Sequence, residues 1–125
     1  MAFCTAINCM DGRVQLPVID YMMKRFDAEY VDSITEPGPV KILAEQTDQF
    51  LLDSIFSRVS VSTQTHGSRV VAVCAHVDCA GNPVDDQTQK QQLKEANHLL
   101  CTKYPDIEII QLWIDANWEV HELSQ

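Results

Sequence analysis

Apolar and polar positions follow one another along the chain in blocks that alternate between strand-like and helix-like patterns. The longest apolar block is Val-Val-Ala-Val-Cys-Ala at residues 70–75, and it predicts a strand over residues 69–76 that is buried on both faces. Shorter apolar blocks predict strands over residues 2–8, 28–34 and 107–114, and a last, short strand over residues 119–123.

Apolar residues at helical spacing fill the segment after the first strand. Val18, Met22 and Phe26 recur at every fourth position within residues 16–27, which predicts an amphipathic helix there. Pro17 suits the first turn of such a helix, because the first turn needs no backbone donor.

The second predicted helix is long. It covers residues 40–58 and follows Glu-Pro-Gly-Pro at residues 36–39, a loop signal that neither a helix nor a central strand accommodates. A polar loop is predicted after it, over residues 60–68. The predicted inner stripe of this helix is Leu43, Phe50, Leu51, Ile55 and Val59.

A glutamine- and lysine-rich segment predicts the third helix. Asp85 or Asp86 caps its start, and the helix ends near Tyr104. The residues of its apolar face are Leu93, Ala96 and Leu100.

This order of elements predicts an α/β fold. We expect a mostly parallel sheet of about four strands with one C-terminal antiparallel strand and helices on both faces. The length of 125 residues fits a single domain over residues 1–125. Sites in such sheets lie beyond the carboxyl ends of the strands, so the loops after Asn8 and Ala75 are the ones to inspect.

Charge and composition narrow the classes of partner. Nine Lys and Arg against eighteen Asp and Glu give a net charge of −9, which argues against nucleic acid and anionic membranes because both need clustered positive charge. No apolar run approaches the roughly 20 residues of a membrane helix. The start of the sequence has no basic segment followed by a long apolar one, so we expect a cytoplasmic protein without a signal peptide.

The loops after Asn8 and Ala75 both contain cysteine. The first reads Cys9-Met-Asp11-Gly-Arg13 and the second His76-Val-Asp-Cys79. Cys9, His76 and Cys79 together supply two thiolates and one imidazole, the ligand set of a Zn²⁺ site that keeps its fourth position open. Buried thiols and a hydrogen-bonded core histidine are the structural alternative for any one of them.

Two charged residues acquire a role beside this ligand set. Asp11 is placed to accept a hydrogen bond from a zinc-bound water or to occupy the open position itself. Arg13 is suited to hold that carboxylate by a bidentate pair and to keep it ionised. A simple surface ion pair is the alternative for Asp11 and Arg13.

At these residues the sequence resembles the β-class carbonic anhydrases. Their pattern is Cys-x-Asp-x-Arg after the first strand and His-x-x-Cys after the third, and the order of elements is similar over nearly the whole chain. The resemblance implies reversible hydration of CO₂ to bicarbonate by a zinc-bound hydroxide. It implies Cys9, His76 and Cys79 as metal ligands, Asp11 and Arg13 as the catalytic pair, and a homodimer.

The sequence also departs from that family. The family has N-terminal helices that embrace the dimer partner, whereas this chain starts at its first strand, so we expect pairing through a sheet edge or the hairpin. Residues 35–39 read Thr-Glu-Pro-Gly-Pro where the family has Arg-Asn-Ala-Gly-Asn, and Ala80 stands where the family has glycine. The sequence is therefore that of a short, divergent β-carbonic anhydrase-like protein.

Other functions stay open at this point. The altered loop leaves room for hydrolysis of another small electrophile such as COS or CS₂. A non-catalytic zinc protein, in which Asp11 closes the metal shell, or a bicarbonate-binding module would use the same residues. A phosphatase loop and a thioredoxin-like site are excluded by spacing, since Cys9 and Arg13 are too close and no Cys-x-x-Cys occurs.

Three cysteines remain outside the predicted metal site. Cys4 and Cys74 are assigned to strand packing, because free cysteine is commonly a core residue. Cys101, near the end of the last helix, is assigned to the core or the surface.

Overall fold

In the computed structural model, which describes residues 1–125, one sheet runs through the molecule in the strand order β2-β1-β3-β4-β5. The first four strands pair in parallel and the last pairs antiparallel with its neighbour. Both features were predicted from the order of elements, and they are confirmed. The strands are β1 (Phe3–Cys9), β2 (Tyr30–Glu36), β3 (Val70–His76), β4 (Glu108–Ile114) and β5 (Val120–Leu123).

The register of the parallel strands brings their carboxyl ends to one edge of the sheet. Cys9 pairs with Glu36 across β1 and β2, and His76 pairs with Ile114 across β3 and β4. Since β1 and β3 are neighbours, their last residues, Cys9 and His76, end side by side. All seven residues of β3 are buried, as its uninterrupted apolar run predicts.

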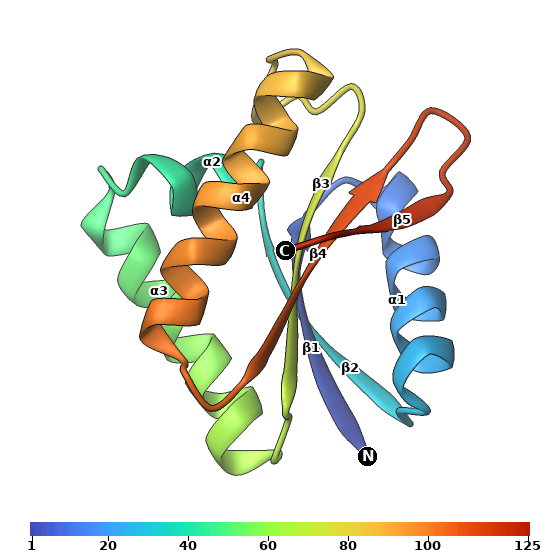
Figure 1. Cartoon of the computed structure of the whole chain (residues 1–125), viewed down its shortest axis with the longest axis vertical. Coiled ribbons are helices and arrows are strands. Elements are labelled where there is room, and N and C mark those ends of the chain that lie inside the picture. The colour runs from blue at the N-terminus through green and yellow to red at the C-terminus, as the bar shows by residue number, and fades with distance from the viewer.

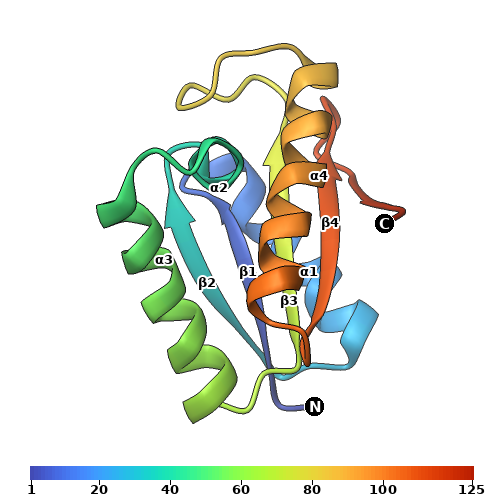
Figure 2. The same ribbon diagram turned by 60° about the vertical axis from the view of Figure 1, so that its left-hand side comes forward.

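Helices cover both faces of the sheet (Figures 1 and 2). Figure 1, which looks along the sheet, shows α1 alone on one side and the other helices on the opposite side. The helices are α1 (Gly12–Phe26), α2 (Pro39–Glu45), α3 (Gln49–Ser60) and α4 (Asp86–Lys103), with a π-helical turn, η1 (Val61–Thr65), directly after α3.

Each face of the sheet has its own apolar core. Val14, Val18 and Met22 of α1 pack with residues of β1, β3 and β4 on one face. On the other face the core includes Leu93, Ala96 and Leu100 of α4, as predicted. The carboxylate of Asp85 accepts a hydrogen bond of 2.7 Å from the backbone N–H of Thr88 and so caps α4.

The prediction of one long helix over residues 40–58 is wrong. Gln46 adopts a left-handed conformation with φ of 56° and ends α2. Asp48 then starts a new helix, because its Oδ1 accepts a hydrogen bond of 3.1 Å from the N–H of Leu51. The left-handed residue and the new cap interrupt a segment whose apolar spacing alone looks continuous.

The break rotates the second half of this segment. Phe50 is 81% exposed, so it does not belong to the inner stripe, whereas Leu43, Ile55 and Val59 are buried there. Residues 60–68 are not simply a loop either, since helical structure continues through η1 as far as Thr65. Buried Ser62 holds this turn against the sheet through hydrogen bonds to Thr5 and Asp32.

Helix α1 begins earlier than predicted. It starts at Gly12 because Asp11 caps it, accepting a hydrogen bond of 2.9 Å from the N–H of Arg13. Pro17 therefore lies inside the helix rather than in its first turn, and it cannot donate to the carbonyl of Arg13.

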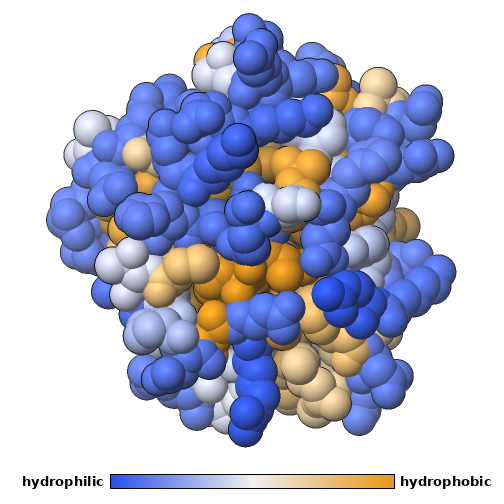
Figure 3. All heavy atoms as spheres, viewed as in Figure 1, coloured by the Kyte–Doolittle hydropathy of each residue, from blue (hydrophilic) through white to orange (hydrophobic).

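Figure 3 shows a mostly hydrophilic face, with apolar atoms gathered in a central strip between the two helical layers. None of the helices has the length and apolar character needed to cross a membrane.

Candidate metal centre

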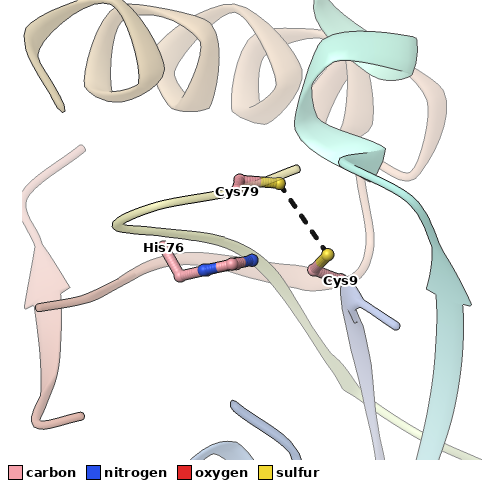
Figure 4. A group of neighbouring side chains, drawn as sticks. All are labelled: Cys9, His76 and Cys79. Carbon is pink, nitrogen blue, oxygen red and sulfur yellow. Dashed lines mark hydrogen bonds between the residues drawn. The ribbon is translucent and has the colours of Figure 1, made fainter. Parts of the chain in front are cut away.

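Three potential metal ligands converge at the carboxyl ends of β1 and β3. Cys9 is the last residue of β1, His76 is the last residue of β3, and Cys79 follows in the next loop. Their ligand atoms all lie within 4.8 Å of one another and all three residues are buried. Figure 4 shows the two sulfurs and the imidazole directed toward a shared space. The structure thus brings together the three residues that the sequence assigns to zinc.

The distance between the two sulfur atoms suits a metal ion. The Sγ atoms of Cys9 and Cys79 are 3.8 Å apart, far beyond the roughly 2.05 Å of a disulfide. Two sulfurs that each lie about 2.3 Å from a tetrahedral Zn²⁺ are about 3.8 Å apart. The pair therefore matches one edge of a zinc tetrahedron.

The imidazole of His76 is oriented for the same role. Its Nδ1 lies 2.6 Å from the carbonyl oxygen of Val77; because a carbonyl only accepts, Nδ1 carries the proton. Nε2 then presents a lone pair, and it is buried without a hydrogen-bond partner. A buried nitrogen without a hydrogen-bond partner destabilises the fold. A histidine that binds a metal through one ring nitrogen commonly donates a hydrogen bond from the other, and His76 has this arrangement. Gln89 supports the site from α4 by donating to the His76 carbonyl at 2.8 Å.

The two thiols are electrostatically unequal. The pKa of Cys9 is lowered to about 4, first because the Cys79 thiol donates to its sulfur and further because the backbone N–H groups of Gly38 and Asp11 donate to it. The pKa of Cys79 is raised, because Cys79 provides that hydrogen bond and because it is buried. The site thus stabilises the thiolate of Cys9. A bound cation would stabilise a second thiolate, at Cys79.

Two loops meet backbone to backbone beside these cysteines. Gly38, with φ of 62°, lies in the loop between β2 and α2, and Gly81 lies in the loop between β3 and α4. A Cβ atom on Gly81 would come within 2.5 Å of the backbone carbon of Pro37. The Thr35–Pro39 segment therefore borders the candidate metal site, although its sequence differs from the β-carbonic anhydrase pattern.

Asp11 lies next to the three ligands but is held by Arg13. Arg13 donates from Nη2 to Asp11 Oδ2 at 2.7 Å and from Nε to Oδ1 at 3.0 Å. These bonds lower the pKa of Asp11 to about 2. Asp11 Oδ2 remains 4.0 Å from His76 Nε2. The carboxylate is ionised, close to the three candidate ligands and held by the arginine.

Arg13 contacts two further residues that sequence reasoning missed. Its Nη2 donates to the carbonyl of Asp78 at 3.2 Å and its Nη1 to the Asp78 carboxylate at 3.3 Å. Its guanidinium carbon lies over the ring of Trp118, 4.6 Å from the ring centroid. The position of Asp78 between the two ligands of His-x-x-Cys was an available signal. Nothing in the local sequence pointed to Trp118.

Gln15 fixes the backbone of the loop that carries Cys9 and Asp11. Its Nε2 lies 2.7 Å from the carbonyl oxygen of Cys9, 3.0 Å from Asn8 Oδ1 and 3.2 Å from the carbonyl oxygen of Asp11. A glutamine one turn into α1 can reach back across its own N-terminus in this way, so the loop between ligand and carboxylate is anchored to the helix.

An arginine from another helix reaches the altered Thr35–Pro39 loop. Arg58 of α3 forms an ion pair with Glu36, the residue that pairs with Cys9 across the sheet. The same guanidinium lies 3.5 Å from the carbonyl oxygen of Thr35. The residue in register with Cys9 therefore carries a salt-bridged carboxylate, which sequence reasoning did not foresee.

The remaining cysteines lie outside the site, and all five are free thiols. Cys4 and Cys74 are buried in the core, and burial raises the pKa of Cys4 to about 11. Cys101 is exposed on α4. A surface pocket of about 450 Å³ between α1 and β5 is lined by residues such as Tyr21 and Trp118 and by none of the three candidate ligands.

Residues 1–124 match the family model described as "Putative carbonic anhydrase". A search of curated proteins finds no match.

Solved structures of carbonic anhydrases share the fold. A carbonic anhydrase from Glaciozyma antarctica is 15% identical with a TM-score of 0.61, and the alignment covers 96% of this chain and 81% of that one. A wild-type β-carbonic anhydrase of Aspergillus fumigatus is 11% identical with a TM-score of 0.61, covering 99% and 90%. A structure of tetrameric β-carbonic anhydrases from Sordaria macrospora is 11% identical with a TM-score of 0.59, covering 98% and 80%.

Proposed function

Because the chain belongs to the "Putative carbonic anhydrase" family, we propose that it catalyses the reversible hydration of CO₂ to bicarbonate with Zn²⁺ bound by Cys9, His76 and Cys79. The main support is the arrangement of these three buried ligands, with the paired Asp11 and Arg13 directly beside them. That arrangement sets an ionised carboxylate, held by an arginine, beside three candidate metal ligands.

The three ligands have distinct tasks in this proposal. Zn²⁺, when bound, supplies the Lewis acidity that makes a water nucleophilic near neutral pH. Cys9 and Cys79 contribute thiolates, and the N–H groups of Gly38 and Gly81 donate toward their sulfurs. His76 binds through Nε2 because its Nδ1 is engaged by the Val77 carbonyl.

Asp11 acts on the attacking water. Its carboxylate accepts a hydrogen bond from that water and so directs an oxygen lone pair toward the carbon of CO₂. Arg13 keeps Asp11 ionised and out of the metal shell through its two-point contact.

The proposed substrate fits the electrostatics of the chain. A net charge of −9 repels polyanions but does not hinder a small neutral molecule such as CO₂.

We also propose a homodimer, since β2 and β5 both leave a free strand edge and an unpaired edge is a template for pairing with another chain.

The experiment that tests this function measures zinc content and CO₂ hydration on the same preparation. The wild-type protein is expected to bind one Zn²⁺ per chain and to hydrate CO₂ in stopped flow. Cys79→Ser is expected to lose both properties. Cys101→Ser, which alters an exposed cysteine on α4, serves as the control and should retain both.

The outcomes separate the alternatives. A fully zinc-loaded protein that hydrates no CO₂ from mildly acidic to alkaline pH would refute the proposed activity and favour a non-catalytic zinc site. Turnover of CS₂ or COS by such a protein would instead assign another small electrophile as substrate.

A further inference from the structure

The guanidinium group of Arg13 uses four of its five N–H groups in its own plane. Nε and Nη2 donate to Asp11, Nη2 also donates to the Asp78 carbonyl, and Nη1 donates to the Asp78 carboxylate. One N–H of Nη1 and the two flat faces of the group remain. Trp118 lies against one of these faces, with the guanidinium carbon 4.6 Å from its ring centroid. Three separate segments of the chain therefore determine where Arg13 points.

The turn between β4 and β5 is built to present Trp118 in this position. Trp118 has a φ of 61°, a conformation rarely adopted by a residue with a large side chain. Its N–H donates to the Asp115 carbonyl at 2.9 Å, and the Asp115 carboxylate accepts from the N–H groups of Asn117 and Glu119 at 2.8 and 3.0 Å. An unfavourable conformation persists only where the surroundings over-determine it.

Trp118 is also partly buried on the α1 side of the sheet. It packs against the apolar cluster that contains Cys9, Cys79 and Val14. Figure 1 shows the β4–β5 turn next to the N-terminal end of α1, where Arg13 lies. The indole is thus supported by the same core that positions the cysteines, and it supports Arg13 in turn.

We propose that Trp118 is a positioning residue for Asp11: by stacking on Arg13 it keeps the Asp11 carboxylate turned away from the metal and the fourth position open. This inference rests on the proposed function, because it assumes a metal bound by Cys9, His76 and Cys79. Without the indole, Arg13 loses a face contact, and a less firmly held Asp11 competes better for the metal.

A measurement on the metal-free protein tests whether Trp118 holds Arg13 in place. In ¹⁵N relaxation spectra, the Nε–Hε group of Arg13 is expected to be rigid in the wild-type protein and mobile in Trp118→Ala. Trp118→Phe should restore most of the rigidity, since it keeps an aromatic face. Phe26→Ala is the matched control, because it removes a ring 4.6 Å from the guanidinium of Arg25 on the same helix. It should mobilise Arg25 and leave Arg13 rigid.

The effect of Trp118 on the fourth metal position is tested with Co²⁺ in place of zinc. The thiolate-to-cobalt absorption band identifies metal bound at the cysteines, and azide titration then reports access to the fourth position. Trp118→Ala is expected to bind azide about two- to fivefold more weakly than the wild type, the range typical of one lost cation–π contact. Trp118→Phe should recover most of the affinity, and Phe26→Ala should match the wild type.

Two results would overturn the inference. One is an Arg13 Nε–Hε group as rigid in Trp118→Ala as in the wild type. The other is equal azide affinity of Co²⁺-loaded wild type and Trp118→Ala. Failure of the wild type to show the cobalt–thiolate band would refute the metal site itself, while the relaxation measurement still decides whether Trp118 positions Arg13.

Discussion

Arg13 holds both carboxylate oxygens of Asp11, and the held carboxylate stops 4.0 Å short of the His76 imidazole nitrogen. The same carboxylate caps α1 through the N–H of Arg13. Asp11 is therefore tied to the helix and to the arginine side chain at once.

Arg13→Lys is expected to lower CO₂ hydration about 10- to 100-fold, the usual effect of removing a residue that orients a metal-site group. Lysine keeps the charge but cannot make the two-point contact. Stopped-flow kinetics at equal zinc content measures the loss. Lys24→Ala, which removes an exposed cation on the same helix, is the control. Full activity of Arg13→Lys would show that charge alone suffices.

Gly81→Ala is expected to destabilise the fold by about 1–3 kcal/mol, as overpacking does. The new methyl group would meet the backbone of Pro37 and Gly38 at 2.5 and 2.9 Å, and backbone cannot move aside easily. Urea unfolding measures the change. Gly12→Ala is the matched control, since nothing lies within 4 Å of its Cβ position, and it should be neutral or slightly stabilising. Equal stability of both variants would contradict the close loop contact.

Ser62→Ala is expected to cost about 1–3 kcal/mol, because it leaves buried hydrogen-bonding groups without their partner. The Ser62 hydroxyl lies within 2.7 Å of hydroxyl or carboxylate oxygens of Thr5, Asp32 and Ser68. Thermal or urea unfolding measures the loss, with exposed Ser57→Ala as the control on the preceding helix. A Ser62→Ala variant as stable as Ser57→Ala would show that η1 does not depend on this network.

The hairpin that carries Trp118 should weaken in acid. The pKa of Asp115 is lowered by its hydrogen bond to His121 and by the backbone N–H groups of Glu119 and Asn117. A carboxyl whose folded pKa is depressed stabilises the protein above its unfolded pKa of about 3.9, and this contribution is lost as the pH falls through the folded value.

The pH dependence can be assigned by substitution. The difference in stability between wild type and Asp115→Asn is expected to be largest near neutral pH and to shrink in acid, as measured by urea unfolding at several pH values. Asp20→Asn, at an exposed position paired only with Lys24, controls for the charge change. A difference that is constant with pH would show that the Asp115 carboxylate is not what stabilises the turn.

Local pattern predicted most of the sheet and the three candidate ligands. The apolar run at residues 70–75 is a buried central strand, and Cys9 and His76 lie at strand ends because parallel strands place their carboxyl ends together. The Cys-x-Asp-x-Arg spacing also predicted the two-point contact of Asp11 with Arg13. These features depend on periodicity and short spacing, which a sequence displays directly.

The tertiary structure decided the features that join distant segments. Gln46 breaks the predicted long helix and turns Phe50 to solvent, although the apolar spacing continues through the break. The sequence by itself determined which residues can bind a metal. Only the fold brought Asp78 and Trp118 onto Arg13, because contacts across 65 or more positions follow from packing and leave no local pattern in the chain.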